Sequence, residues 1–353
     1  MEVSSLVKRK QVEILKPGNL LSPLGNIAQI GWGRQPYLDC NLDDLHFYPI
    51  KSLLFLRVKR WDYYAVFTPR MFFSATIADL GYAGNIFVYL LDYDKDIFHE
   101  EGLVIPLGRG VILPRNSTSW TTKFKNNNAS LCFEANGESR SISIDWPAFH
   151  EESGISAEIM FSCPASHESM SIVIPFSEKR FYYNRKINCM PAVGTITYGD
   201  DEEKLVASTS IGSLDWGRGV WPYSSFWNWA SSSGFLPDGR TIGLNLGNGF
   251  GDLSQATENC VILDGLLQKL DEVDFIYNPK NFMSPWQFRS NDNRLKLEFI
   301  PFKERTAVTN LGIIHSAVHQ LFGRYNGQLI PDEGETIQIQ DMVGFAEEHY
   351  ARW

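Results

Sequence analysis

The stretch LDWGRGVWPYSSFWNWASSSGFLPDGRTIGLNLGNGFGD, residues 214–252, gives the clearest sequence signal for the fold. Residues 225–234 and 240–248 both have the composition of extended strands, and the Asp238-Gly239 pair between them is typical of a β-hairpin turn. Side chains alternate between the two faces of a strand. One face of the first strand is therefore predicted to carry Tyr223, Ser225, Trp227, Trp229 and Ser231.

The returning strand of this hairpin is predicted to have one bulky face and one small face. Ile242, Leu244 and Leu246 fall on the first, whereas Gly243 and Asn245 fall on the second. Small residues opposite large rings are what the wall of a binding pocket requires. The stretch therefore indicates an aromatic-lined pocket without identifying what enters it.

Length and composition limit the class of protein. The chain has 353 residues, which is too many for one ordinary hydrophobic core, so two domains are expected. Aromatic residues make up 13% of the chain and are spread along it, which favours strands. Lys and Arg number 32 against 41 Asp and Glu, giving a net charge of −9. This balance argues against sequence-independent nucleic-acid binding, which needs a basic surface.

Targeting signals and cysteine usage indicate the compartment. The N-terminal sequence lacks the apolar segment of a secretory signal, and the best apolar run, residues 86–91, has only strand length. We therefore expect a soluble, cytoplasmic protein without a transmembrane segment. The five cysteines are far apart and form no C-x-x-C motif, so free thiols are expected, without disulfides or structural zinc.

Strand-like runs bounded by Pro, Gly, Asn or Asp follow one another along the whole chain. Residues 311–323 are the exception, because they fit either a helix or a strand. The pattern predicts an all-β protein of two consecutive β-barrels or strongly curved β-sandwiches. A rise in charge before Pro191 sets the domain boundary. The predicted units are an entry segment, an N-terminal and a C-terminal β-barrel domain, over residues 1–35, 36–185 and 186–353.

Five long motifs support a family resemblance. They are YYNRKINCMPA at 182–192, LDWGRGVWPYSSFWNWAS at 214–231, DGRTIGLNLG at 238–247, ATEN at 256–259 and AEEHYARW at 346–353. With these motifs the chain resembles the family catalogued as domain of unknown function 2804, from about residue 20 to the end. The family's name carries no activity, so this resemblance implies none.

A more distant resemblance does imply a fold and a chemistry. The order of an Asp, a Trp-x-Trp and an Asp-Gly-Arg before an apolar strand is similar to the carotenoid 1,2-hydratase and AttH-like group. That resemblance implies two lipocalin-like (calycin) barrels, with relatives that hydrate or cyclise terpenoid or polyketide chains. Asp215 would match the family's proton-donating acid, and Trp227 and Trp229 its Trp-x-Trp. The histidine that usually follows the acid is replaced by Trp216-Gly217.

Two carboxylates are candidate catalytic residues. Asp215 is interpreted as a buried acid whose pKa is raised by aromatic neighbours, so that it could protonate an alkene or enol. Alternatively, Asp215 pairs with Arg218, three residues further on, in a structural salt bridge. Glu258 is the second candidate, either facing the same cavity or simply beginning a strand.

Seven residues of the central stretch are candidate ligand contacts. Aromatic rings could hold a flat or polyene-like ligand and stabilise positive charge, or they could fill a barrel core. Buried amides favour a pocket, because a dry core rarely contains them. The candidate ligand-binding residues are Trp216, Arg218, Trp221, Tyr223, Trp227, Trp229 and Asn245.

No metal or cofactor is predicted. His315 and His319 lie four residues apart and could bind a metal together with Glu347 or Glu348, although packed or exposed histidines are the simpler interpretation. The glycine-rich GNGFGD at 247–252 lacks the spacing of a phosphate-binding loop.

The sequence supports two functions about equally. The first is binding of a hydrophobic small molecule in an aromatic-lined pocket of the C-terminal barrel. The second is an acid-assisted hydratase, cyclase or isomerase that acts on a lipophilic, terpenoid- or polyketide-like substrate through Asp215 or Glu258. A purely structural interaction protein is a third alternative.

Overall fold

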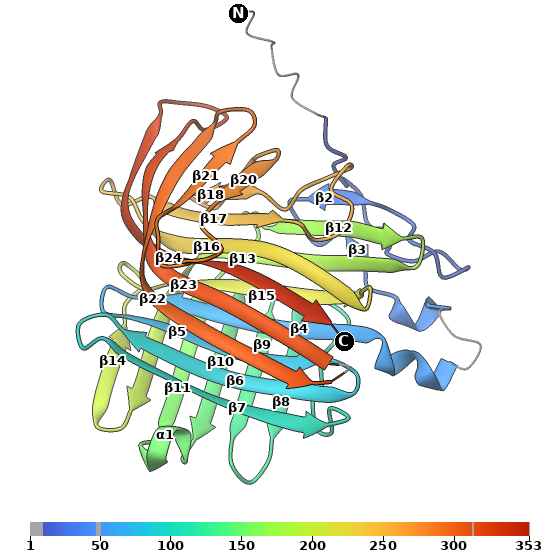
Figure 1. Ribbon diagram of the computed structural model, residues 1–353, viewed down its shortest axis with the longest axis horizontal. Coiled ribbons are helices and arrows are strands. Elements are labelled where there is room, and N and C mark those ends of the chain that lie inside the picture. The colour runs from blue at the N-terminus through green and yellow to red at the C-terminus, as the bar shows by residue number, and fades with distance from the viewer. Residues whose placement is uncertain (1–9, 47–50, 313, 353) are drawn as a thin grey trace, which may run out of the picture.

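The structure is a computed structural model that describes residues 10–46, 51–312 and 314–352. It is nearly all β, with two large curled sheets stacked against each other (Figure 1). The predicted all-β class with two successive curved barrels is confirmed. Only short helical turns occur among the described residues, namely η1 (Leu42–Asp44), η2 (Lys51–Leu56) and α1 (Phe149–Glu152).

The first sheet has 13 strands among the described residues, and ten of them form the path β7-β6-β5-β4-β15-β13-β11-β10-β9-β8. Strands β12, β14 and β2 attach beside β13 and β12, while β1 (Gly18–Asn19) and β3 (Leu38–Asp39) form a separate parallel pair. The bounds are β2 (Gly31–Gly33), β4 (Val58–Phe67), β5 (Met71–Asp79), β6 (Ala83–Asp92), β7 (Ile97–Pro106), β8 (Ser119–Lys125), β9 (Ser130–Asn136), β10 (Ser139–Trp146), β11 (Ile155–Ser162), β12 (Met170–Ser177), β13 (Arg180–Tyr198), β14 (Asp201–Leu205) and β15 (Ile211–Val220).

The second sheet runs in the order β19-β18-β17-β16-β24-β23-β22-β21-β20. The predicted hairpin is its β16–β17 pair, in which Asn228 faces Asn248 and Phe235 faces Thr241. Residues 314–323, left open between helix and strand, belong to β23. The bounds are β16 (Ser224–Phe235), β17 (Thr241–Asn248), β18 (Cys260–Leu263), β19 (Leu266–Lys269), β20 (Val273–Ile276), β21 (Trp286–Ser290), β22 (Leu295–Leu311), β23 (Ile314–Leu329) and β24 (Ile337–Arg352).

Three clusters of buried apolar side chains hold the sheets together. One fills the curl of the first sheet, one fills the curl of the second, and one lies between the two. Strand alternation divides the residues among them. On β4, Tyr64 and Val66 enter the first curl, whereas Tyr63 and Ala65 face the second sheet. On β16, Ala230 enters the second curl and Trp229 packs against the cluster between the sheets.

The change from one sheet to the other occurs later in the chain than the predicted domain boundary between residues 185 and 186. That boundary falls inside β13, and β15 still pairs with β13 and β4 of the first sheet. The sheets change between Val220 and Ser224. The charged residues that suggested a linker, Arg185 and Lys186, are in fact buried, each 4% exposed. The boundary of independently folding domains stays a prediction.

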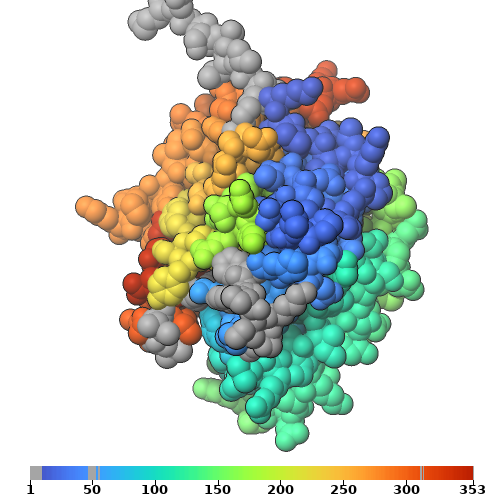
Figure 2. Space-filling model, turned by 90° about the vertical axis from the view of Figure 1, so that its right-hand side faces the viewer, coloured from blue at the N-terminus to red at the C-terminus, as the bar shows by residue number. Residues whose placement is uncertain are grey.

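The described part of the predicted entry segment, residues 10–35, touches both sheets. Trp32 of β2 pairs with Ile172 of β12, and Arg34 Nη1 donates to the Leu267 carbonyl of β19, 2.8 Å away. Figure 2 shows these N-terminal residues, in blue, covering one side of the molecule beside β12. Residues 1–9 of the segment lie outside the described part of the chain.

Two further sequence-based expectations concern the whole chain. All five cysteines are free thiols, as expected. Within the described ranges, no helix combines the length and apolar character needed to cross a bilayer.

The close approach of the two sheets gives a test in the β16–β17 hairpin. A Cβ added at Gly243 would lie 2.7 Å from Cys189 Sγ and 2.8 Å from Asn188 Cβ on β13. We expect Gly243→Ala to lower the free energy of unfolding by ~1–3 kcal/mol, because it overpacks the contact between the sheets.

The matched control is Gly234→Ala on the paired strand. There a Cβ would meet Met342 Cγ at an ordinary 3.5 Å, so stability should stay within ~1 kcal/mol of wild type. Chemical denaturation of both variants measures the difference. Equal losses at the two positions would contradict the proposed close contact.

Candidate functional site

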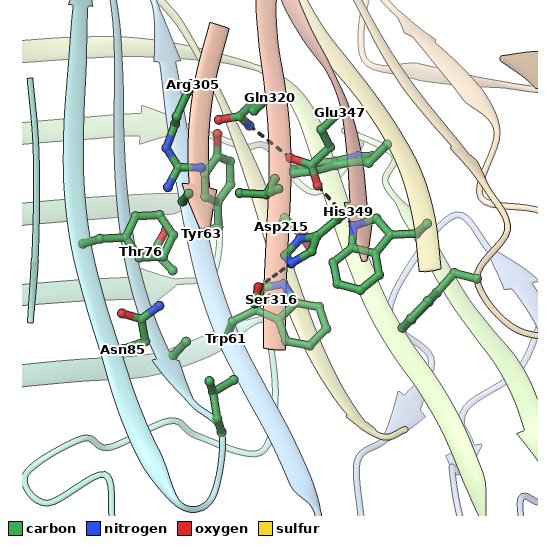
Figure 3. A pocket seen from close by; sticks show the side chains of 18 of the residues that line it. Trp61, Tyr63, Thr76, Asn85, Asp215, Arg305, Ser316, Gln320, Glu347 and His349 are labelled. Carbon is green, nitrogen blue, oxygen red and sulfur yellow. Dashed lines mark hydrogen bonds between the residues drawn. The ribbon is translucent and has the colours of Figure 1, made fainter. Parts of the chain in front are cut away.

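A cavity of about 290 Å³ lies between the two sheets (Figure 3). Its walls come from β4, β5, β6, β13 and β15 of the first sheet and from β16, β22, β23 and β24 of the second. The sequence placed the pocket inside the C-terminal barrel, and this was wrong. The interior of the second curl is filled by Leu244, Leu246 and Trp286, whereas Trp227 and Trp229 point from the outer face of β16 toward the first sheet.

Strand alternation on β15 separates the candidate residues of the DWGR motif. Asp215 lines the cavity, whereas Trp216 and Arg218 point into the first curl and are each 1% exposed. Arg218 Nη1 lies 3.0 Å from Asp62 Oδ1, and its guanidinium covers the Trp216 ring at 4.2 Å. The alternative salt bridge between Arg218 and Asp215 is therefore wrong, and so is the prediction that Trp216 and Arg218 line the pocket.

Asp215 and Glu258 do converge on the cavity, where a buried lysine joins them. Lys186 Nζ lies 2.9 Å from Asp215 Oδ2 and 3.7 Å from Glu258 Oε2. It also lies 3.9 Å from the centre of the Trp229 ring, in a cation–π contact. Asn184 Nδ2 donates to Asp215 Oδ1 at 2.5 Å. The two predicted acids thus share one ammonium group, which the sequence analysis missed because Lys186 comes from β13.

Asn245 does not line the cavity but forms hydrogen bonds with two residues that do. Its Oδ1 accepts a hydrogen bond from Trp229 Nε1 at 2.7 Å, and its Nδ2 donates to Glu258 Oε2 at 3.1 Å. Asn245 therefore fixes the orientation of two cavity residues. Gly247 leaves room for this arrangement, because a Cβ there would lie 2.1 Å from Glu258 Oε1.

Indole rings form the opposite wall. Trp221 lies edge-on to Trp61 and to Trp227, with ring centres 5.3 and 5.8 Å apart. Trp61 crosses β15 where Gly217 leaves space, since a Cβ at Gly217 would lie 2.0 Å from that ring. Tyr223, also predicted to bind ligand, is 45% exposed and is not among the lining residues. It precedes β16, so the alternation that aims Trp227 and Trp229 does not extend to it.

Glu347 is a cavity carboxylate that the sequence analysis considered only as a metal ligand. It projects from β24 and accepts hydrogen bonds from Trp227 Nε1 at 3.1 Å and Gln320 Nε2 at 3.3 Å (Figure 3). Burial raises the pKa of Glu347 to about 7, against the opposing effects of Trp227 and the positive charge of Arg305. The sequence signal that could have identified Glu347 was its position two residues after Phe345, because alternate residues of a strand share one face.

A hydrogen-bonded chain continues from Glu347 across the two sheets. Gln320 Oε1 accepts from Tyr89 Oη at 3.0 Å, and Tyr89 Oη lies 3.0 Å from Tyr63 Oη. Burial raises the pKa of both tyrosines, so both hydroxyls are protonated at neutral pH. Gln320, Tyr89 and Tyr63 therefore connect Glu347 to the first sheet by hydrogen bonds.

His349 forms a second polar contact, nearer the other end of the cavity. Its Nε2 lies 2.8 Å from Ser316 Oγ, and its ring packs on Trp227 with centres 4.1 Å apart. Burial, followed by the charge of Arg305, lowers the pKa of His349 to about 3. The imidazole is therefore neutral at pH 7 and a weak base, which argues against activation of Ser316 as a hydrolase nucleophile.

The metal alternative is not supported by the contacts of its residues. His319 pairs with Glu348 on β24, so Glu348 shares its face, whereas Glu347 projects from the opposite face. Glu348 Oε2 accepts a hydrogen bond from Tyr277 Oη. His319 Nδ1 lies 2.7 Å from Glu304 Oε1, and its ring packs on Phe282. Across residues 10–46, 51–312 and 314–352, no three metal-binding side chains cluster.

The raised pKa of Glu347 predicts a pH-dependent stability. Between about pH 4.5, its ordinary value, and about pH 7, the unfolded chain releases this proton and the folded chain keeps it. The free energy of unfolding therefore falls as pH rises through this window, by about 3 kcal/mol at most from this group.

The measurement is denaturant unfolding at several pH values for wild type and Glu347→Gln. The wild-type value minus the variant value should fall between pH 4.5 and 7 and then level off. A difference that is constant with pH would show that Glu347 titrates normally.

The comparisons with known proteins address the fold and the family. Three similar solved structures are CghA with Sch210972, kievitone hydratase from Nectria haematococca and a putative AttH from Nitrosomonas europaea. Their TM-scores are 0.51, 0.51 and 0.50, at 10%, 12% and 12% identity. They cover 84%, 84% and 83% of this chain and 88%, 89% and 92% of their own. These likenesses confirm the double lipocalin-like barrel expected from the distant resemblance.

The sequence itself identifies the family. No curated protein sequence matches the chain. The family described as "Domain of unknown function (DUF2804)" matches residues 11–353, which is nearly the whole chain. Its match includes all five motifs that suggested the resemblance, and the chain belongs to the DUF2804 family.

Proposed function

We propose that the cavity between the sheets binds a hydrophobic small molecule. The observation that carries this proposal is a partly open cavity of about 290 Å³ walled by indole, phenol and phenyl rings from both sheets. Ligand pockets typically have volumes of about 300–1,000 Å³, mostly apolar walls and a few placed polar groups. The cavity lies near the lower end of that range, which fits a compact ligand.

The polar groups are arranged to orient such a ligand. Glu347, Gln320 and Arg305 lie toward one end of the cavity, while Asn85 and Ser316 lie toward the other (Figure 3). Between them the walls combine aromatic rings with the polar side chains of Asp215, Thr76 and His349. A ligand that is mainly apolar, with hydrogen-bonding groups toward its ends, matches this distribution.

Blocking the cavity tests binding without removing an aromatic core residue. Ala307 on β22 lines the cavity, so Ala307→Trp should fill it and weaken binding of the neutral fluorophore N-phenyl-1-naphthylamine at least tenfold. Val308, the next residue, is 59% exposed, so Val308→Trp is the matched control and should leave the affinity unchanged. Fluorescence titration gives both dissociation constants. Equal affinity for both variants would place the binding elsewhere.

A second candidate function, acid-assisted addition to or isomerisation of an unsaturated ligand, is favoured by Glu347. A carboxylic acid with a pKa of about 7 can exchange a proton near neutral pH. Its proton would add to one carbon of an alkene, and the cation formed on the other carbon would face Trp227 and Trp229. Water would then add and release a proton to the Glu347 carboxylate. The fold shared with kievitone hydratase is compatible with this proposal.

The earlier candidates Asp215 and Glu258 have a different place in this proposal. Both contact the Lys186 ammonium, which makes them charge partners of that group. They would hold the ammonium against Trp229 and shape the cavity. Proton donation by either residue stays a prediction, which the next experiment separates from donation by Glu347.

Glu347→Gln and Asp215→Asn distinguish the two assignments. Native mass spectrometry of the protein purified from its own host would identify the bound ligand. Incorporation of deuterium from D₂O into that ligand would then report proton transfer. Glu347→Gln should slow incorporation by ~10²–10⁴-fold, the usual worth of a general acid. Ligand affinity should stay within a few-fold. If Asp215→Asn slows deuterium incorporation more than Glu347→Gln does, Asp215 is the acid. If wild type incorporates no deuterium, the protein binds the ligand without catalysing proton transfer.

A further inference from the structure

The interior of the first curled sheet carries an excess of positive charge. Arg140 on β10 and Arg185 on β13 are 2% and 4% exposed, and Arg218 is 1% exposed. Asp62 forms a salt bridge with Arg218 through Oδ1, and its Oδ2 accepts a hydrogen bond from Thr122. Among the described residues, no carboxylate forms a salt bridge with Arg140 or Arg185, although the charge of Arg140 acts on the Asp62 carboxylate that pairs with Arg218. Buried charges in proteins are normally paired, so these two guanidinium groups require an explanation.

The two arginines are held next to each other. Arg140 Nη2 and Arg185 Nη1 donate to the same acceptor, the carbonyl oxygen of Ser117, at 2.7 and 3.0 Å. Arg185 Nε donates to Ser169 Oγ at 3.0 Å. Burial lowers the pKa of Arg185 to about 9, and repulsion by Arg140 adds to the effect. The fold therefore brings two like charges together at one neutral oxygen.

Several donors around this pair lack a well-aligned protein partner. Arg140 Nε and Nη1 and the hydroxyl of Tyr64 are buried and have no partner at good hydrogen-bond geometry among the described residues, although Tyr64 itself approaches Arg140 through a weaker side-chain contact. The Arg140 charge acts on Tyr64, so the two groups are close. Trp120 lies in the same cross-strand row as Arg140, through Ala135, and its indole N–H is also unsatisfied. Buried donors without acceptors are costly and rare.

We propose that a small inorganic anion, a halide or an oxyanion such as phosphate, binds between Arg140 and Arg185 inside the first barrel. Such an anion supplies both the missing negative charge and the missing acceptors. The guanidinium group presents donors in a planar fork that suits oxyanions. The site is independent of the cavity between the sheets, because Arg185 enters the first curl whereas its neighbour Lys186 lines the cavity.

Anion-dependent stability of the full chain tests this site. Thermal unfolding would be followed at constant ionic strength while sodium gluconate, whose anion is bulky, is replaced by sodium chloride or sodium phosphate. A bound anion should raise Tm in proportion to the logarithm of its concentration above its Kd, by roughly 3 °C or more at a hundred times its Kd. Calorimetric titration with phosphate and with chloride should show one site per chain and identify which anion binds.

Arg140→Met should remove this anion-dependent rise in Tm. In gluconate this variant should be at least as stable as wild type, because it lacks one unpaired buried charge. Arg185→Met serves the same purpose if Arg140→Met does not fold. Arg289→Met, at an exposed position, is the control and should keep the wild-type response.

Three results would overturn the proposal. One is an anion-dependent change in Tm that is the same in wild type, Arg289→Met and Arg140→Met. Another is an Arg140→Met variant that is destabilised equally in all salts, which would mean that Arg140 is already satisfied. The third concerns Cys163, which interacts electrostatically with Arg185. If anion dependence is absent in wild type and present only in Cys163→Ala, the Cys163 side chain already occupies the position proposed for the anion.

Discussion

The central strands of this protein bury side chains on both of their faces, and the rest of the structure depends on this constraint. On β15, Trp216 enters the first curl while Asp215 enters the cavity between the sheets. A shift of one residue in strand register would exchange the two sets. The register of β15 against β4 and β13 therefore fixes the fold and the cavity at the same time.

Burial on both faces forces polar side chains into the contact between the sheets, where each must find a partner. Lys186 reaches Asp215 and Glu258 from other elements. Glu347 instead meets the neutral donors Trp227 and Gln320, and burial raises its pKa to about 7. The carboxylates of one cavity thus receive different environments because they contact different strands.

Close approach of the sheets also requires small residues at defined points. Gly217 makes room for the Trp61 ring, Gly247 for the Glu258 side chain and Gly243 for β13. Each of these glycines lies on a face that points toward the neighbouring sheet or cavity. Glycines therefore occur where a bulky side chain or a neighbouring strand approaches, which lets the two sheets pack closely around the cavity.

The sequence by itself determined the all-β class, the β16–β17 hairpin and the shared face of Trp227 and Trp229, because these follow from turn residues and two-residue alternation. Only the tertiary structure decided that the cavity lies between the sheets, that Arg218 pairs with Asp62, and that Glu347 meets Trp227. The last two contacts join residues 156 and 120 positions apart. Local patterns assign a side chain to a strand face, but the packing of whole sheets selects what that face meets.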